Sequence, residues 1–167
     1  MKIFVDAPAR MPTVNVGTQA QIMGCLHILK RRFPAATFVM LTRHPAQERH
    51  YLDATGLEIE YVPQAASPWV AWRQLRGILQ RVDAVAAAWG DGYVGQSSWR
   101  LLQRARLLKR HRVPLILVAA SVGPFRRGPD AWCARRGLKL FDCVTVRDLN
   151  SLRHVQRLGM RAAQCLP

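Results

Sequence analysis

Arg147 is the side chain of this sequence best placed to bind an anion. It directly follows the short apolar segment Cys143–Val146, which predicts a buried strand. In an open α/β sheet, ligands bind at the carboxyl ends of the strands. A guanidinium group there can hold a carboxylate or a phosphate through two parallel hydrogen bonds. Asp148 is predicted to cap the next helix, with Ser151 at its third position as a further candidate for substrate contact.

A glycine-rich segment with the sequence G-D-G-Y-V-G begins at Gly90, after the fourth predicted strand. The spacing fits the dinucleotide-binding motif G-x-G-x-x-G, but that motif needs an acidic residue further on to hold a ribose. No Asp or Glu occurs between Gly92 and Pro129, so a nicotinamide or flavin cofactor is not indicated. Asp91 either exchanges a proton with a substrate or fixes the turn through its own side chain. Gly90 and Gly92 are candidates for substrate contact.

The turn Ser121-Val-Gly123-Pro-Phe ends another apolar segment, Val113–Ala119. A serine followed by a Gly-Pro turn at a strand end can offer a hydroxyl and a free amide to an anionic group. No G-x-S-x-G sequence is present, so a serine hydrolase is not indicated. The alternative is that Ser121 and Gly123 only shape a structural turn.

A third candidate anion site lies at the start of the first predicted helix, at Asn15, Gly17 and Thr18. A glycine that opens a helix leaves backbone amides free at the positive end of the helix dipole, which suits a phosphate or carboxylate. The alternative is an ordinary cap, in which Asn15 or Thr18 accepts hydrogen bonds from the helix amides.

The cysteines and histidines predict no metal site. No C-x-x-C pair occurs and no His lies at ligand spacing, so all the cysteines are interpreted as buried thiols in a reducing cytosol; they are Cys25, Cys133, Cys143 and Cys165. The histidines show no convergent spacing; they are His27, His44, His50, His111 and His154. The sequence begins without an apolar run of signal-peptide length, and no segment approaches the length of a membrane span.

The charge is strongly positive, with 25 Lys and Arg against 10 Asp and Glu, and 21 of these cations are arginines. This predicts attraction to an anionic partner, which could be a phosphorylated small molecule, an anionic lipid surface, an acidic polysaccharide or nucleic acid. The alternative is that the arginines lie on solvated helix faces, as the pattern predicts for Arg100, Arg104 and Arg110. Nucleic acid is disfavoured because the few aromatic residues are not interleaved with basic ones.

The whole chain alternates short apolar segments with stretches of helical spacing, which predicts a parallel sheet covered by helices. We expect six or seven strands, because the apolar segments are 3–5, 37–41, 58–62, 83–89, 113–119, 143–146 and 162–166. No repeat or linker divides the chain, so residues 1–167 are predicted to form a single Rossmann-like α/β domain.

Two of these segments together resemble the polysaccharide pyruvyl transferase family. The resemblance rests on the Ser-x-Gly-Pro-Phe turn from Ser121 and on the Val-Thr-Val-Arg-Asp-x-x-Ser segment that ends at Ser151, with Leu-Gly following at Gly159. The sequence departs from the family pattern where Thr18 replaces an acidic residue and Ala120 replaces a glutamine.

The resemblance implies a transferase that moves a pyruvyl group from phosphoenolpyruvate to a sugar of a cell-envelope polysaccharide or its precursor. It assigns Arg147 to donor binding and makes Asp91 the best acceptor of a proton from the attacking sugar hydroxyl. No metal or organic cofactor is expected, and the partners are the donor and a sugar or lipid-linked saccharide. The expected location is the cytoplasm, with peripheral contact to an anionic membrane as an option.

The resemblance also implies that residues 1–167 are the amino-terminal half of a longer, GT-B-like enzyme. The general acid would then lie in the other half, and the fragment alone would be inactive. Two alternatives stay open. One is half of a GT-B glycosyltransferase with a nucleotide-sugar donor, and the other is a non-catalytic basic domain that binds anions or nucleic acid.

Overall fold

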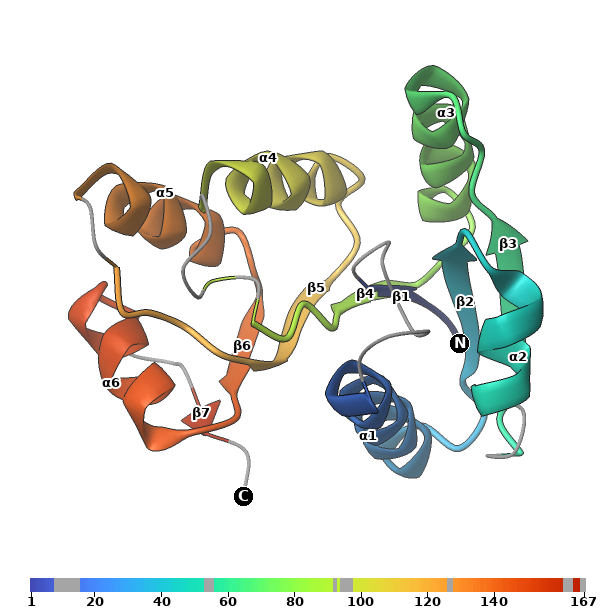
Figure 1. Ribbon diagram of the computed structural model, residues 1–167, viewed down its shortest axis with the longest axis horizontal. Helices are drawn as coiled ribbons and strands as arrows, with labels where there is room; N and C mark the ends of the chain where they lie inside the picture. The colour runs from blue at the N-terminus through green and yellow to red at the C-terminus, as the bar shows by residue number, and fades with distance from the viewer. Residues whose placement is uncertain are drawn as a thin grey trace. The chain divides into compact units, whose positions relative to one another are not determined.

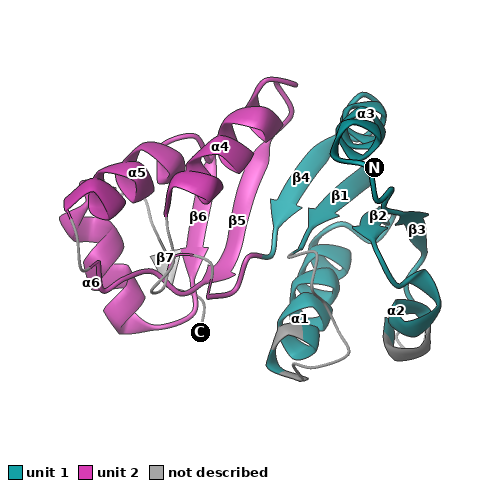
Figure 2. Cartoon of the chain, turned by 45° about the horizontal axis from the view of Figure 1, so that its top comes forward, with its two compact units in different colours: residues 1–88 teal, residues 89–167 magenta. Residues whose placement is uncertain are grey.

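The computed structural model describes residues 1–7, 16–52, 56–91, 93, 98–125, 128–160 and 164–165. The chain divides into two compact units, Met1–Ala88 and Trp89–Pro167, which are coloured separately in Figure 2. The organisation as a single domain stays a prediction.

Unit 1 is a parallel sheet covered on both faces. Its elements are β1 (Lys2–Asp6), α1 (Val16–Arg32), β2 (Thr37–Thr42), α2 (Pro45–Leu52), β3 (Ile59–Pro63), α3 (Pro68–Leu79) and β4 (Ala84–Ala87). The strands lie in the order β3-β2-β1-β4, and each neighbouring pair is parallel. In Figures 1 and 2, α1 and α3 lie on opposite sides of these strands.

The core of unit 1 follows from apolar strands and helices that are apolar on one side. Phe4 and Phe38 of the strands are fully buried, as is Ile22 of α1. On α3, Leu75, Ile78 and Leu79 are buried, while Arg76 and Gly77 between them are exposed. Burial of such side chains is the main stabilising contribution to a sheet with helices on both faces.

Unit 2 repeats the alternation with α4 (Ser98–Lys109), β5 (Leu115–Ala120), α5 (Gly128–Leu138), β6 (Cys143–Val146), α6 (Leu149–Arg157) and β7 (Gln164–Cys165). Its strands lie in the order β5-β6-β7, again all parallel. α4 and α5 pack side by side on the strands (Figure 1). Gly137 of α5 allows this approach, because a Cβ there would lie 3.1 Å from the Tyr93 hydroxyl and 3.4 Å from the Leu102 Cα.

A β-bulge interrupts β5 just before its carboxyl end. The pairing with β6 shifts register between Leu117 and Ala120, and Ala119 has a φ of 48°. The Thr145 hydroxyl of β6 stabilises the bulge, because it accepts a hydrogen bond from the Ala119 amide at 3.0 Å and donates one to the Leu117 carbonyl at 3.1 Å. Bulges of this kind redirect a strand end beside a site.

The predicted fold class is confirmed, since parallel strands alternate with helices along the whole chain. The predicted burial of every cysteine is wrong for Cys143, which is exposed. Cys143 is the first residue of β6, and the alternation of that strand places Val144 and Val146 in the core instead. Cys25 and Cys133 are buried as predicted, and the Cys165 side chain lies outside the described part.

Candidate active site

Backbone hydrogen bonds hold Gly90 and Tyr93 beside the end of β5. The Ser121 amide donates to the Gly90 carbonyl at 2.9 Å, and the Gly123 amide donates to the Tyr93 carbonyl at 3.1 Å. Tyr93 and Val122 also form a parallel bridge. Gly90 and Tyr93 of the glycine-rich segment therefore lie beside the Ser-x-Gly-Pro-Phe turn, at the carboxyl end of β5, where ligands bind in such sheets.

Arg147 and Asp91, the two charged residues predicted for the site, form an ion pair in this same region. The Arg147 Nη2 atom donates to the Asp91 Oδ1 atom at 2.6 Å. Both side chains are open to solvent, with exposed fractions of 50% for Arg147 and 63% for Asp91. Exposed ion pairs are worth only about 0–1 kcal/mol. A ligand carboxylate or phosphate can therefore replace Asp91 at the guanidinium at small cost.

Ser151 links the start of α6 to the turn after β5. Its buried hydroxyl donates to the Asp148 carboxylate at 2.8 Å and accepts from the Val122 amide at 3.0 Å. Asp148 caps the helix as predicted, since it also accepts from the Ser151 amide at 2.7 Å. The hydrogen bond from that amide is the largest cause of the lowered pKa of Asp148. Because the Ser151 hydroxyl is engaged on both sides, the geometry favours a positioning role for it; direct contact with a substrate stays a prediction.

The turn after β5 offers a hydroxyl, while the amides of its first three residues are engaged. The amides of Ser121, Val122 and Gly123 all donate within unit 2, so none of these three is the free amide expected for the turn. The Ser121 Oγ atom is different, because it is buried and has no hydrogen-bond partner among the described residues. Buried hydroxyls usually find a partner, so Ser121 keeps its place as a candidate for contact with a polar ligand group.

Gly123 and His154 lie in direct contact, which the sequence did not predict. Gly123 has a φ of +74°, and a Cβ built on it would lie 2.7 Å from the His154 Cγ atom. The His154 ring also meets Phe125 edge-on, with 6.5 Å between the ring centroids. His154 follows Ser151 by three residues and so shares its face of α6. That spacing is the signal that could have placed His154 beside the turn.

The predicted site residues around the start of α1 belong to unit 1. Gly17 is the second residue of α1 and is exposed. Thr18 lies in the same first turn, but its side chain is outside the described part, as are Asn15 and Gly92 altogether. The roles of Asn15, Gly17 and Thr18 in substrate contact stay predictions. Gly90, in contrast, lies at the site in unit 2, buried and with a φ of 53°.

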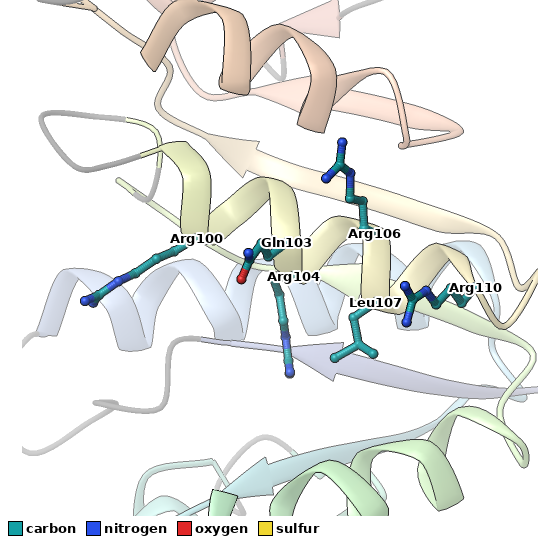
Figure 3. A pocket seen from close by; sticks show the side chains of 6 residues that line it. All are labelled: Arg100, Gln103, Arg104, Arg106, Leu107 and Arg110. Atoms are coloured by element: carbon teal, nitrogen blue, oxygen red, sulfur yellow. The ribbon is translucent and has the colours of Figure 1, made fainter. Parts of the chain in front are cut away.

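A second cationic feature of unit 2 is a shallow hollow of about 470 Å³ along α4 (Figure 3). Its lining residues all belong to α4 or its end: Arg100, Gln103, Arg104, Arg106, Leu107 and Arg110. The predicted outward placement of Arg100, Arg104 and Arg110 agrees with this lining. These lining residues include no carboxylate and no buried polar group, so the hollow has positive charge but no counterpart of Asp91 or of the Ser121 hydroxyl.

Within the described ranges, no group of three or more His, Cys, Asp or Glu side chains is placed to hold a metal ion. Nor is any helix of that part long and apolar enough to cross a membrane.

The unit 2 site thus combines an exposed guanidinium, an exposed carboxylate and a buried hydroxyl at strand ends of a Rossmann-like α/β fold. Comparison with known proteins identifies the family: residues 15–166 match the polysaccharide pyruvyl transferase family, and the chain belongs to it. Among proteins with curated descriptions, none is significantly similar to this sequence.

Solved structures support the same fold. The chain is similar to Anabaena HepE, whose crystal structure is in complex with UDP-glucose, with a TM-score of 0.63 at 12% identity. The similarity covers 99% of this chain and 43% of that chain. The chain therefore spans less than half the length of this GT-B-like neighbour.

Proposed function

We propose that this chain carries part of the active site of a pyruvyl transferase that uses phosphoenolpyruvate as donor. The acceptor is a sugar of a cell-envelope polysaccharide or its precursor, and the reaction takes place in the cytoplasm. The observation that carries the proposal is the exposed Arg147–Asp91 pair at the strand ends of a chain from this family.

Arg147 binds the donor in this proposal. Phosphoenolpyruvate carries a carboxylate and a phosphate, and either group fits the fork of a guanidinium. The donor displaces Asp91 from Arg147, which exchanges one carboxylate–guanidinium contact for a stronger one with two hydrogen bonds. Since the Asp91–Arg147 pair is exposed, its loss offsets little of the donor's binding free energy.

Asp91 then acts as the proton acceptor. A general acid protonates the methylene carbon of the donor, and an acceptor hydroxyl attacks the adjacent carbon while Asp91 takes its proton. A second hydroxyl of the same sugar attacks the same carbon as phosphate leaves with its pair of electrons. The product is a ketal, and the two hydroxyl protons balance those taken up by the methyl group and the phosphate. The reaction needs no metal or organic cofactor, because the donor is already activated.

The general acid is outside the residues assigned here, and we place it in a second half of the protein. As part of the proposal, residues 1–167 alone release no phosphate from phosphoenolpyruvate and acceptor, whereas the protein expressed from its whole reading frame does. Phosphate release by residues 1–167 alone would remove this element of the proposal.

The donor test compares Arg147→Lys with Arg110→Lys in the protein expressed from its whole reading frame. Lysine keeps the charge but loses the fork, and hydrogen bonds to charged groups contribute about 1.5–3 kcal/mol each. Phosphoenolpyruvate affinity should therefore fall by about tenfold to a hundredfold for Arg147→Lys, and stay unchanged for Arg110→Lys on the α4 hollow. Equal titration curves for the two variants would refute the donor role of Arg147.

A nucleotide-sugar transferase is the second candidate, favoured by the UDP-glucose bound to HepE. The same titration distinguishes it. Binding of UDP-glucose that depends on Arg147, with no binding of phosphoenolpyruvate, would replace the pyruvyl transferase proposal by this one.

A further inference from the structure

α3 presents an outer face with unusually exposed apolar side chains. Trp69 is 67% exposed and Val70 is 45% exposed, while Arg73 and Arg76 are exposed beside them. Large apolar side chains gathered on one face indicate an interaction surface more often than scattered ones do. We call these four residues the α3 outer face.

The aromatic rings of α3 are ordered along the helix. Trp69 stacks on Trp72 with 5.4 Å between ring centroids and 14° between planes. The Arg76 guanidinium lies over the Trp72 ring, 5.8 Å from its centroid, so Trp69, Trp72 and Arg76 form one row. The row holds the exposed rings in place, so little side-chain entropy is lost when they meet a partner.

The connection that precedes α3 is fixed to the helix. The Gln74 side chain accepts a hydrogen bond from the Ala65 amide at 2.9 Å and donates one to the Pro63 carbonyl at 3.1 Å. On the inner side, Leu75, Ile78 and Leu79 are buried. The helix that carries the α3 outer face is therefore fixed both to the connection before it and to the core beneath it.

The charged side chains of α3 itself are all arginines. No Asp or Glu occurs between Glu60 and Asp83, and neither Arg73 nor Arg76 forms an ion pair within the described residues. Two guanidinium groups without an ion-pair partner in the described part, close to the exposed Trp69, attract phosphate groups. Tryptophan side chains at the headgroup level and basic side chains that attract anionic lipids are both typical of segments that lie at a membrane surface.

We propose that the α3 outer face docks on a bilayer that contains anionic phospholipids. Trp69 and Val70 enter the boundary between headgroups and acyl chains, and Arg73 and Arg76 contact lipid phosphates. Charge complementarity favours this occupant, because Arg73 and Arg76 carry the sign that attracts the phosphates of an anionic bilayer. This proposal does not depend on the reaction proposed for unit 2.

The test is cosedimentation of the protein, expressed from its whole reading frame, with vesicles of phosphatidylcholine mixed with phosphatidylglycerol. Arg73→Gln and Arg76→Gln should each lower the partition coefficient by roughly fivefold. Trp69→Ala should lower it as well, and Trp69→Tyr should keep most of the binding, because tyrosine is also an interfacial side chain. Binding should weaken with added salt and be minor on pure phosphatidylcholine.

α5 offers a matched control. Trp132 is 49% exposed and Arg136 lies 4.7 Å from its ring centroid, but α5 carries Asp130 in its first turn. Trp132→Ala and Arg136→Gln should leave partitioning unchanged. If they lowered it as much as the α3 variants do, or if the α3 variants partitioned like the unchanged protein, the proposal would be overturned.

Two measurements without vesicles distinguish a membrane from other occupants of the α3 outer face, namely a second copy of the chain or another part of the protein. A change of oligomeric state in Trp69→Ala, measured by sedimentation without vesicles, would point to a second copy and overturn the proposal. Acrylamide quenching of tryptophan fluorescence, measured without vesicles, reports whether Trp69 is open to solvent. If Trp69→Phe and the unchanged protein were quenched to the same extent, another part of the protein would cover Trp69. That result would also overturn it.

Discussion

Replacement of Gly123 by alanine tests the geometry of the site most directly. Gly123 has a φ of +74°, which L residues rarely adopt, and its missing Cβ leaves room for the His154 ring. A Cβ would lie 2.7 Å from the His154 Cγ and 2.8 Å from its Cδ2. Contacts this short require the imidazole ring, or α6 itself, to move.

The loss of unfolding free energy expected for Gly123→Ala has two parts. The left-handed conformation costs an alanine about 1–2 kcal/mol, partly offset by about 0.4–1 kcal/mol from the stiffer unfolded chain. The steric contact with His154 adds about 1–3 kcal/mol, as overpacking typically does. Gly159→Ala isolates the second part, because Gly159 also has a positive φ, +82°, but a Cβ there would meet, among the described residues, only the Arg135 Nη2 atom at 4.0 Å.

Urea unfolding followed by circular dichroism measures both variants. Gly123→Ala should be less stable than Gly159→Ala by about 1–3 kcal/mol, with an unchanged m-value. The double variant Gly123→Ala with His154→Ala should recover this difference, because the ring is gone. A coupling energy near zero in this cycle, or equal destabilisation by the two glycine substitutions, would refute the contact.

Three further outcomes follow from other contacts. Thr145→Val removes the hydroxyl that stabilises the β5 bulge and should cost about 1–3 kcal/mol of unfolding free energy, whereas Thr145→Ser should be nearly neutral; equal losses would argue against the hydroxyl's role. Hydrogen bonds from Arg81 lower the pKa of Glu60 from 4.5 to about 2, so Glu60 stabilises the fold above its unfolded-state pKa. Glu60→Gln should therefore lower the unfolding free energy at neutral pH, by at most about 1 kcal/mol for this exposed pair, and the difference from the unchanged protein should disappear as the pH falls toward 2. A difference that persists at low pH would contradict the role of the Glu60 charge. A thiol reagent should modify exposed Cys143 in the native protein and spare buried Cys25, whose pKa burial raises to about 12; mass spectrometry of the native protein checks this, and equal labelling would count against the described burial.

The order of strands and helices could be predicted because the spacing of apolar residues within each element shows which of its side chains are buried. Cys143–Val146 has the predicted bounds, and the Asp148 cap needs only a local hydrogen bond to Ser151. The placement of Arg147 at a strand end followed from these two elements together. Local chemistry of this kind leaves a direct signal in the sequence.

The contacts between segments could not be predicted in the same way. The bulge at Ala119 depends on a hydroxyl from another strand, and the fit of His154 against Gly123 depends on how α6 lies over the turn. Nothing in the spacing of Asp91 and Arg147 says that they meet, since 56 residues separate them. Such pairs are decided by tertiary packing, which a local pattern does not record.

The double engagement of the Ser151 hydroxyl joins two segments into one cooperative unit. The amide of Val122 can exchange its hydrogen with water only when it leaves this hydroxyl, and the hydroxyl is held by the same carboxylate that caps α6. Opening of the helix start therefore releases the strand end with it. The amides of Val122 and Ser151 should exchange with the same opening free energy, although 29 residues separate them. Arg147 directly precedes the Asp148 cap, so the backbone that carries the guanidinium is held by the same unit.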